Sequence, residues 1–84
     1  MNEIYLTSHS ITYAQKMQKV LQLNGINARI IRPDLRLSES GCAYAVSVSE
    51  KMSAETIEVL KNYRLMPVKF ILRENGGVLR ELRV

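Results

Sequence analysis

The spacing of hydrophobic residues changes along the chain in a way that predicts alternating strands and helices. Over residues 2–7, Ile4 and Leu6 alternate with their neighbours, which is the period of a β-strand. Over residues 11–24 the apolar residues recur at helical spacing, and Gly25 ends this helix as a left-handed cap. The same pattern predicts the remaining elements, which are a strand over 26–32, a strand over 43–49, a helix that Ser53 caps, and a strand over 68–73.

The C-terminal segment carries a turn signal between two apolar runs. The dipeptide Asn75-Gly76 is typical of a two-residue hairpin turn. This turn would place Leu72 opposite Leu79 and add a fifth strand, so that the hairpin covers residues 68–84. A turn centred one residue later would set two arginines opposite each other, which is unfavourable.

The order of the elements predicts an α+β fold. Strand, helix, strand, strand, helix, strand is the ferredoxin-like split βαββαβ sandwich, here with an added C-terminal hairpin strand, in one domain over residues 1–84. We expect the first and third strands to be parallel neighbours. That arrangement would place Cys42 near the start of the first strand and His9 roughly 15 to 20 Å away. We therefore expect neither His9 nor a helix start to lie near Cys42.

Composition narrows the function classes. A chain of 84 residues with 46% hydrophobic residues has a thin core, so a homodimer or a docked partner would add useful burial. The sequence has neither a membrane-length apolar stretch nor the pattern of a signal peptide, which predicts a cytoplasmic protein. The net charge of +4 favours acidic partners in general and does not single out nucleic acid.

Cys42 is the only cysteine, and it follows a polar loop. One cysteine cannot form an internal disulfide, and with the single histidine it cannot build a cysteine-rich zinc site. Two interpretations remain, a buried packing residue or a reactive thiol. Strand alternation, which places Cys42 on the same face as Tyr44 and Val46, favours packing. In the reactive interpretation, the Arg36 and Arg73 side chains and the main-chain amides of Ser40 and Gly41 would stabilise the thiolate.

The loop before Cys42 adds a family resemblance. Pro33, Arg36-Leu37-Ser38 and Gly41-Cys42 follow a helix that ends in Gly25-Ile26. Over roughly residues 3–72 this pattern resembles the selenium/sulfur (Se/S) carrier protein-like family of small bacterial domains. The resemblance implies that Cys42 is a carrier thiol in a loop with Arg36, Ser38 and Gly41. It also implies a relay of sulfur or selenium, as a persulfide-type adduct, between donor and acceptor proteins without a cofactor.

Other functions stay open at this point. A regulatory or protein-interaction module is the main alternative, because Tyr5, Ala43, Ala45 and Ile71 would form an apolar outer surface of the sheet. Weak RNA binding is a third option that only the basic charge supports, since the RNA-recognition motif of aromatic strands is missing. The sequence has no glycine-rich phosphate loop, paired carboxylates or metal-ligand cluster at usable spacing, which argues against an enzyme.

Overall fold

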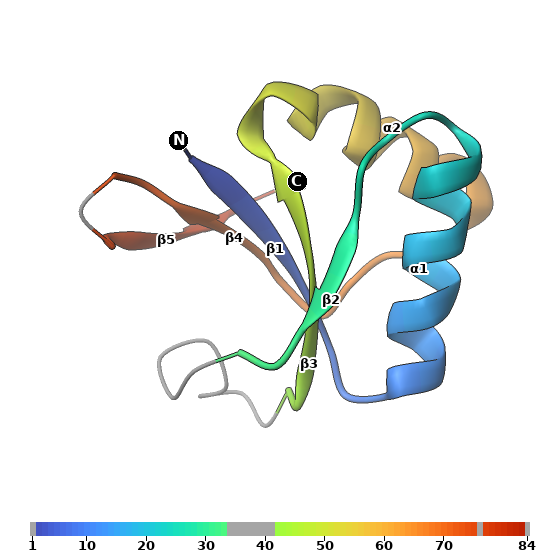
Figure 1. Ribbon diagram of the computed structural model, residues 1–84, viewed down its shortest axis with the longest axis horizontal. Helices are drawn as coiled ribbons and strands as arrows, with labels where there is room; N and C mark the ends of the chain where they lie inside the picture. The colour runs from blue at the N-terminus through green and yellow to red at the C-terminus, as the bar shows by residue number, and fades with distance from the viewer. Residues whose placement is uncertain (1, 34–41, 76, 84) are drawn as a thin grey trace.

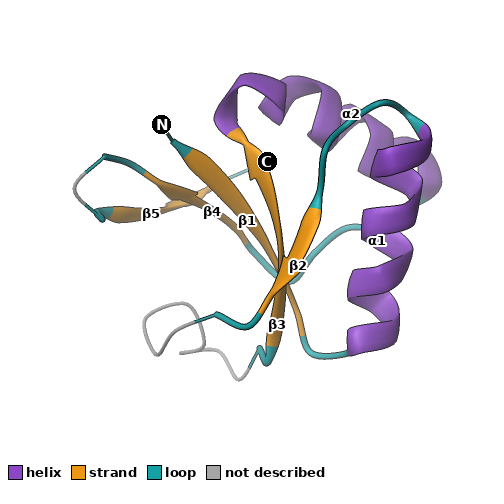
Figure 2. Ribbon diagram, in the orientation of Figure 1, coloured by secondary structure: helices purple, strands orange, loops and turns teal. Residues whose placement is uncertain are grey.

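The computed structural model describes residues 2–33, 42–75 and 77–83, which form a small α+β domain. Five antiparallel strands form one sheet in the order β2-β3-β1-β4-β5, and both helices cover the same face (Figures 1 and 2). The elements are β1 (Glu3–Ser8), α1 (Ile11–Leu23), β2 (Arg29–Ile31), β3 (Tyr44–Ser49), the short 3₁₀ helix η1 (Glu50–Met52), α2 (Ser53–Tyr63), β4 (Phe70–Arg73) and β5 (Leu79–Leu82). Within the described ranges, no helix has the length and apolar character needed to cross a membrane.

The pairing of β1 with β3 corrects a prediction. The two strands are neighbours, but they run antiparallel, with Glu3 opposite Ser49 and Ser8 opposite Tyr44. The expected parallel pairing is wrong because the helical crossovers connect β1 to β2 and β3 to β4. Those are the pairs that run in the same direction, and β3 turns back against β2. The start of β3 therefore lies beside the end of β1.

The helix ends follow from local hydrogen bonds. Ser10 caps α1, since its side chain accepts a hydrogen bond from the amide of Tyr13. Gly25, with φ 78°, ends the helix as predicted. Ser53 does not cap α2 but is its first residue. Met52 takes the N-cap position of α2 without a side-chain hydrogen bond, and Ser49 instead caps η1 by accepting a hydrogen bond from the amide of Lys51.

The C-terminal hairpin exists, but its register differs from the predicted one. Leu72 lies opposite Arg80, not Leu79, because three residues separate Glu74 from Val78. The amide of Glu74 donates to the carbonyl of Val78 at 2.8 Å, and Gly77 takes a φ of 84°. In a three-residue hairpin loop the last residue takes a left-handed backbone conformation with positive φ, which glycine adopts without strain. The observed register also keeps the arginines from facing each other.

The main core lies between the sheet and the helices. Alternate residues of the three central strands meet the inward faces of α1 and α2, as the strand and helix periods predict. The fully buried members of this core include Leu6 from β1, Met17 and Leu21 from α1, Val46 from β3 and Leu60 from α2. Packing against the two helices therefore determines which side chains of each strand point into the core.

The helix-free face carries a second, smaller core. Tyr5, Ala45 and Ile71 are only 5%, 0% and 8% exposed, and Ile31 and Leu79 pack against them. The sequence placed the first three on this face but predicted an exposed apolar surface. That expectation is wrong for them, because the chain itself covers these side chains. Ala43 is exposed.

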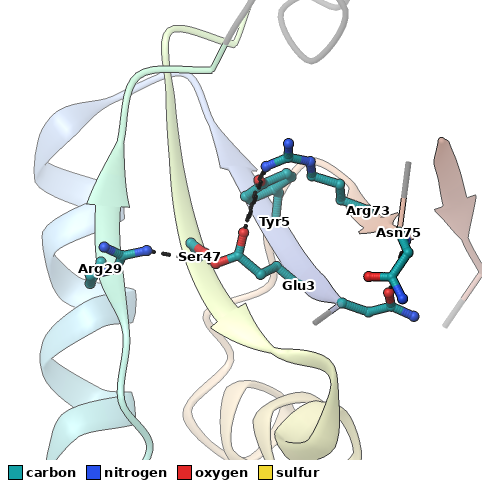
Figure 3. Close-up of polar contacts among 7 residues, drawn as sticks. Glu3, Tyr5, Arg29, Ser47, Arg73 and Asn75 are labelled. Atoms are coloured by element: carbon teal, nitrogen blue, oxygen red, sulfur yellow. Dashed lines mark hydrogen bonds and ion pairs between the residues drawn. The ribbon is translucent and has the colours of Figure 1, made fainter. Parts of the chain in front are cut away.

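A polar cluster on the same face connects four strands, and we call it the Glu3 network (Figure 3). The Glu3 carboxylate of β1 accepts hydrogen bonds from Ser47 of β3 at 3.1 Å and from the Tyr5 hydroxyl at 3.2 Å. It forms ion pairs with Arg29 of β2 at 3.6 Å and Arg73 of β4 at 3.9 Å. Arg73 also donates to the Tyr5 hydroxyl at 3.1 Å. One carboxylate thus helps to set the register of four strands.

Replacement of Glu3 should destabilise the fold. Glu3→Ala leaves two hydroxyl groups and two arginines without their shared acceptor, and we expect a loss of about 2 kcal/mol in the free energy of unfolding. Urea denaturation measures this loss. Glu58→Ala, at an exposed position of α2, is the control and should change stability by less than about 0.5 kcal/mol. Equal losses in the two variants would show that the Glu3 network does not stabilise the sheet.

Candidate functional site

Cys42 lies two residues before β3 and is completely buried, with 0% of its surface exposed. The register of β1 and β3 fixes its neighbourhood, since Ser8 lies opposite Tyr44. The pairing ends at these two residues, and the chain bends at His9 before Ser10 caps α1. The thiol residue therefore lies where β1 ends and α1 begins, which is the lower end of the molecule in Figure 1.

This placement reverses two expectations from the sequence. His9 immediately follows β1, so it lies at the Cys42 end of the sheet and not at the opposite end. The start of α1 lies there as well, because Ser10 is its cap. Both errors have one cause, the assumed parallel pairing of the first and third strands. A partial positive charge at the N-terminal end of a helix is therefore available near Cys42.

The structure tests the position of only one of the residues predicted to support the Cys42 thiolate. Arg36, Ser38, Ser40 and Gly41 lie outside the described residues, so their roles stay predictions. Arg73 lies opposite Glu3, at the other end of β1, and its side chain contacts Glu3 and Tyr5. The expectation that Arg73 lies at the Cys42 end is therefore not met.

Arg32 is a cation at this end that the sequence analysis did not identify. It follows β2, whose last residue, Ile31, lies opposite Ala45 of β3. Its guanidinium carbon lies 5.6 Å from the centre of the Tyr44 ring, within the range of a cation–π contact. The signal was present, because an arginine one residue beyond β2 must lie near the start of β3 once these strands pair.

The turn between β1 and α1 is well ordered by its serines. The Ser8 hydroxyl donates to the carbonyl of Ser10 at 2.9 Å and accepts its amide at 3.2 Å. Ser8 is buried, with 2% exposed, whereas His9 is exposed. His9 also lines a hollow of about 290 Å³ with Tyr13 and residues 66–68. Hydrogen bonds thus fix the backbone on the β1 side of Cys42.

At this end of the sheet the thiol of Cys42 is the candidate reactive group, and Arg32 and the start of α1 supply positive charge. Within residues 2–33, 42–75 and 77–83, no cluster of three or more His, Cys, Asp or Glu side chains could hold a metal ion. The groups that the fold places at this end of the sheet are one thiol, a serine-rich turn, an imidazole, a guanidinium and a helix start. Arginine and helix N-termini are the surroundings in which cysteine thiolates form.

A disulfide trap tests the placement of Cys42. Ser10 follows β1 by two residues and Cys42 precedes β3 by two residues, so we expect their Cα atoms to lie within the ~7 Å that a disulfide requires and Ser10→Cys to crosslink to Cys42 on mild oxidation. Non-reducing peptide mapping detects the bond. Asn2→Cys is the control at the far end of β1 and should give no crosslink. A crosslink from position 2 with none from position 10 would restore the parallel arrangement.

Comparison with known families agrees with the motif around this site. Residues 3–72 match the family described as Putative Se/S carrier protein-like, and this range includes β1, both helices and Cys42. Searches of curated proteins and of solved structures give no match. Because the match covers most of the 84 residues, the chain belongs to the Se/S carrier protein-like family.

Proposed function

We propose that this protein carries sulfur or selenium on Cys42, as a persulfide-type adduct, and passes it to a partner protein. The observation that carries the proposal is that this chain of 84 residues, a member of a carrier-like family, contains one cysteine, which lies within the matched range. In a carrier of this kind, Cys42 has to be both the acceptor and the donor of the transferred atom. The protein then acts as a relay without turnover chemistry of its own.

The transfer balances without an external oxidant. The Cys42 thiolate attacks the outer sulfur of a donor persulfide, a new S–S bond forms at Cys42, and the donor leaves as a thiolate with the electron pair of its broken S–S bond. An acceptor thiolate then attacks the outer sulfur on Cys42 and releases the Cys42 thiolate. Selenium would follow the same path through an S–Se bond. The atom moves at an unchanged oxidation level.

Two features near Cys42 support this chemistry. Arg32, which follows β2, and the N-terminal end of α1 supply positive charge at the Cys42 end of the sheet, where an anionic donor or acceptor sulfur would approach. We also keep Arg36, Ser38, Ser40 and Gly41 as proposed loop residues around the thiol. Arg73 is left out because it lies beside Glu3.

The burial of Cys42 constrains how the relay works. A completely buried thiol cannot meet a donor, so the chain around it must open before transfer. Cys42 precedes the last described pair of the β1–β3 ladder, so this opening need not break the central sheet. Between transfers, burial would protect the adduct from water and from other thiols. This behaviour suits a reduced, cytoplasmic setting, which we also propose.

We also propose that the fold is the ferredoxin-like split βαβ sandwich and that β5 belongs to the same domain. In support, β3 lies between β1 and β2, β1 lies between β3 and β4, and both helices cover one face. β5 pairs with β4 and extends the same sheet.

The burial of Cys42 also favours a second candidate, a regulatory or interaction module in which the thiol only packs. A partner would then bind the exposed surfaces of the protein without sulfur exchange. RNA binding gains no support, because Tyr5 and Tyr44 pack in cores on opposite faces of the sheet and cannot stack bases together.

Sulfur uptake separates the two candidates. After incubation of the native protein with inorganic polysulfide, intact-mass analysis should show one added sulfur atom that a reductant removes. Cys42→Ser should add none. Arg32→Gln should slow uptake about fivefold, equivalent to ~1 kcal/mol for one nearby charge, whereas Lys51→Gln, an exposed position in η1 at the opposite end of β3, should not change the rate. Uptake only after unfolding in urea would favour the interaction module.

A further inference from the structure

The connection between α2 and β4 exposes apolar side chains on a fixed backbone. Met66 is 36% exposed and Val68 is 46% exposed, with Pro67 between them. We call residues 66–68 the Met66–Val68 ridge. In Figure 1 this connection runs from behind α1 to the start of β4 near the centre of the view.

Hydrogen bonds to two other elements hold the ridge in place. The amide of Val68 donates to the carbonyl of Thr7 at 2.9 Å, and the next amide, that of Lys69, donates to the Thr7 hydroxyl at 2.9 Å. The Tyr13 hydroxyl of α1 donates to the carbonyl of Met66 at 2.8 Å. A partner that binds here would lose little free energy to ordering of this backbone, because it is already ordered.

The ridge separates two hollows. The first, of about 290 Å³, is the one lined by His9 and Tyr13, with Ser8 and Ser10. The second, of about 310 Å³, lies toward β4 and β5, and its further lining residues are Lys69, Phe70, Glu81, Leu82 and Arg83. Each hollow has the volume to receive a side chain of a partner on either side of the exposed ridge.

The first hollow lies at the Cys42 end of the sheet. Ser8 lines it and also pairs with Tyr44 of β3, and Thr7 binds the ridge while pairing with Ala45 of β3. β3, which begins two residues after Cys42, therefore lies about 10 Å across the sheet from the ridge, or two strand spacings. A protein bound on the ridge would have its own reactive sulfur within reach of this end.

The surrounding charge indicates which partner fits. Among the described residues that line the two hollows, the basic side chains are Lys69 and Arg83, and the acidic one is Glu81, which pairs with Lys69 at 3.5 Å. Arg64 adds an exposed cation two residues before the ridge. The excess of positive charge matches the net charge of +4 and favours carboxylates on the partner.

We propose that the Met66–Val68 ridge is the docking surface for a sulfur donor or acceptor protein, which presents an apolar side chain flanked by carboxylates. This inference rests on the proposed carrier function. The apolar side chain would enter a hollow beside the ridge, and the carboxylates would face Arg64, Lys69 and Arg83. Docking would then bring the partner thiol to Cys42.

Two sulfur sources test the proposal. One is inorganic polysulfide, and the other is a synthetic peptide that carries a cysteine persulfide beside a Glu-Leu-Glu sequence. In Val68→Glu, we expect transfer from the peptide to Cys42 to be about tenfold slower, or ~1.4 kcal/mol, and uptake from polysulfide to be unchanged. Val78→Glu is the matched control, because Val78 is 59% exposed in the distant hairpin, and it should change neither rate.

The two failures are distinguishable. Equal peptide rates in Val68→Glu and Val78→Glu, with normal uptake from polysulfide, would overturn the docking surface and leave the carrier function intact. If the wild-type protein takes up no sulfur from either source, the carrier function fails. Amide chemical shifts of the full protein, titrated with the peptide without its persulfide, then decide the docking surface. Shifts centred on residues 9, 13, 66, 68 and 69 would support it, and their absence would contradict it.

Discussion

The antiparallel pairing of β1 with β3 is the constraint on which the candidate site depends. With Ser8 opposite Tyr44, the start of β3 lies beside the end of β1, and Cys42 comes to the start of α1. The pairing of β2 with β3 brings Arg32 to the same end, where it contacts the Tyr44 ring. Thr7 connects β1 to the Met66–Val68 ridge on its other side. A reversal of β3 would move Cys42 to the other end of the sheet and separate it from both Arg32 and the start of α1.

The two ends of the sheet differ in what they provide. At the start of β1, the Glu3 network holds four strands together through one partly buried carboxylate. Between the two ends, Tyr5, Ala45 and Ile71 form a small core on the helix-free face. At the other end, the ladder stops before Cys42, and the thiol is buried without belonging to either core cluster. A segment that lies beyond the last pair of a stable sheet, as Cys42 does, can open locally while the fold persists.

The sequence predicted the elements well and their arrangement less well. The periods of Ile4 and Leu6, and of the apolar residues of α1, are local signals, and the end of α1 at Gly25 follows from its φ of 78°. Strand direction depends on which strands the helical crossovers connect. Because we predicted that β1 and β3 run parallel, we expected His9 far from Cys42 and Arg73 near it, and the structure shows the reverse. Arg32 was missed because its role arises only from pairing between strands. The hairpin register was wrong because a local dipeptide, Asn75-Gly76, suggested a turn one residue too short.

The central claim is that Cys42 is an obligatory intermediate in sulfur transfer. The most direct test is a single-turnover experiment in which radiolabelled sulfur is supplied as a donor persulfide with an acceptor thiol present, and the label on each species is followed in time. The account predicts that label on Cys42 rises first and then falls at the rate at which the acceptor gains it. An acceptor that gains label at the same rate with Cys42→Ser would contradict the account.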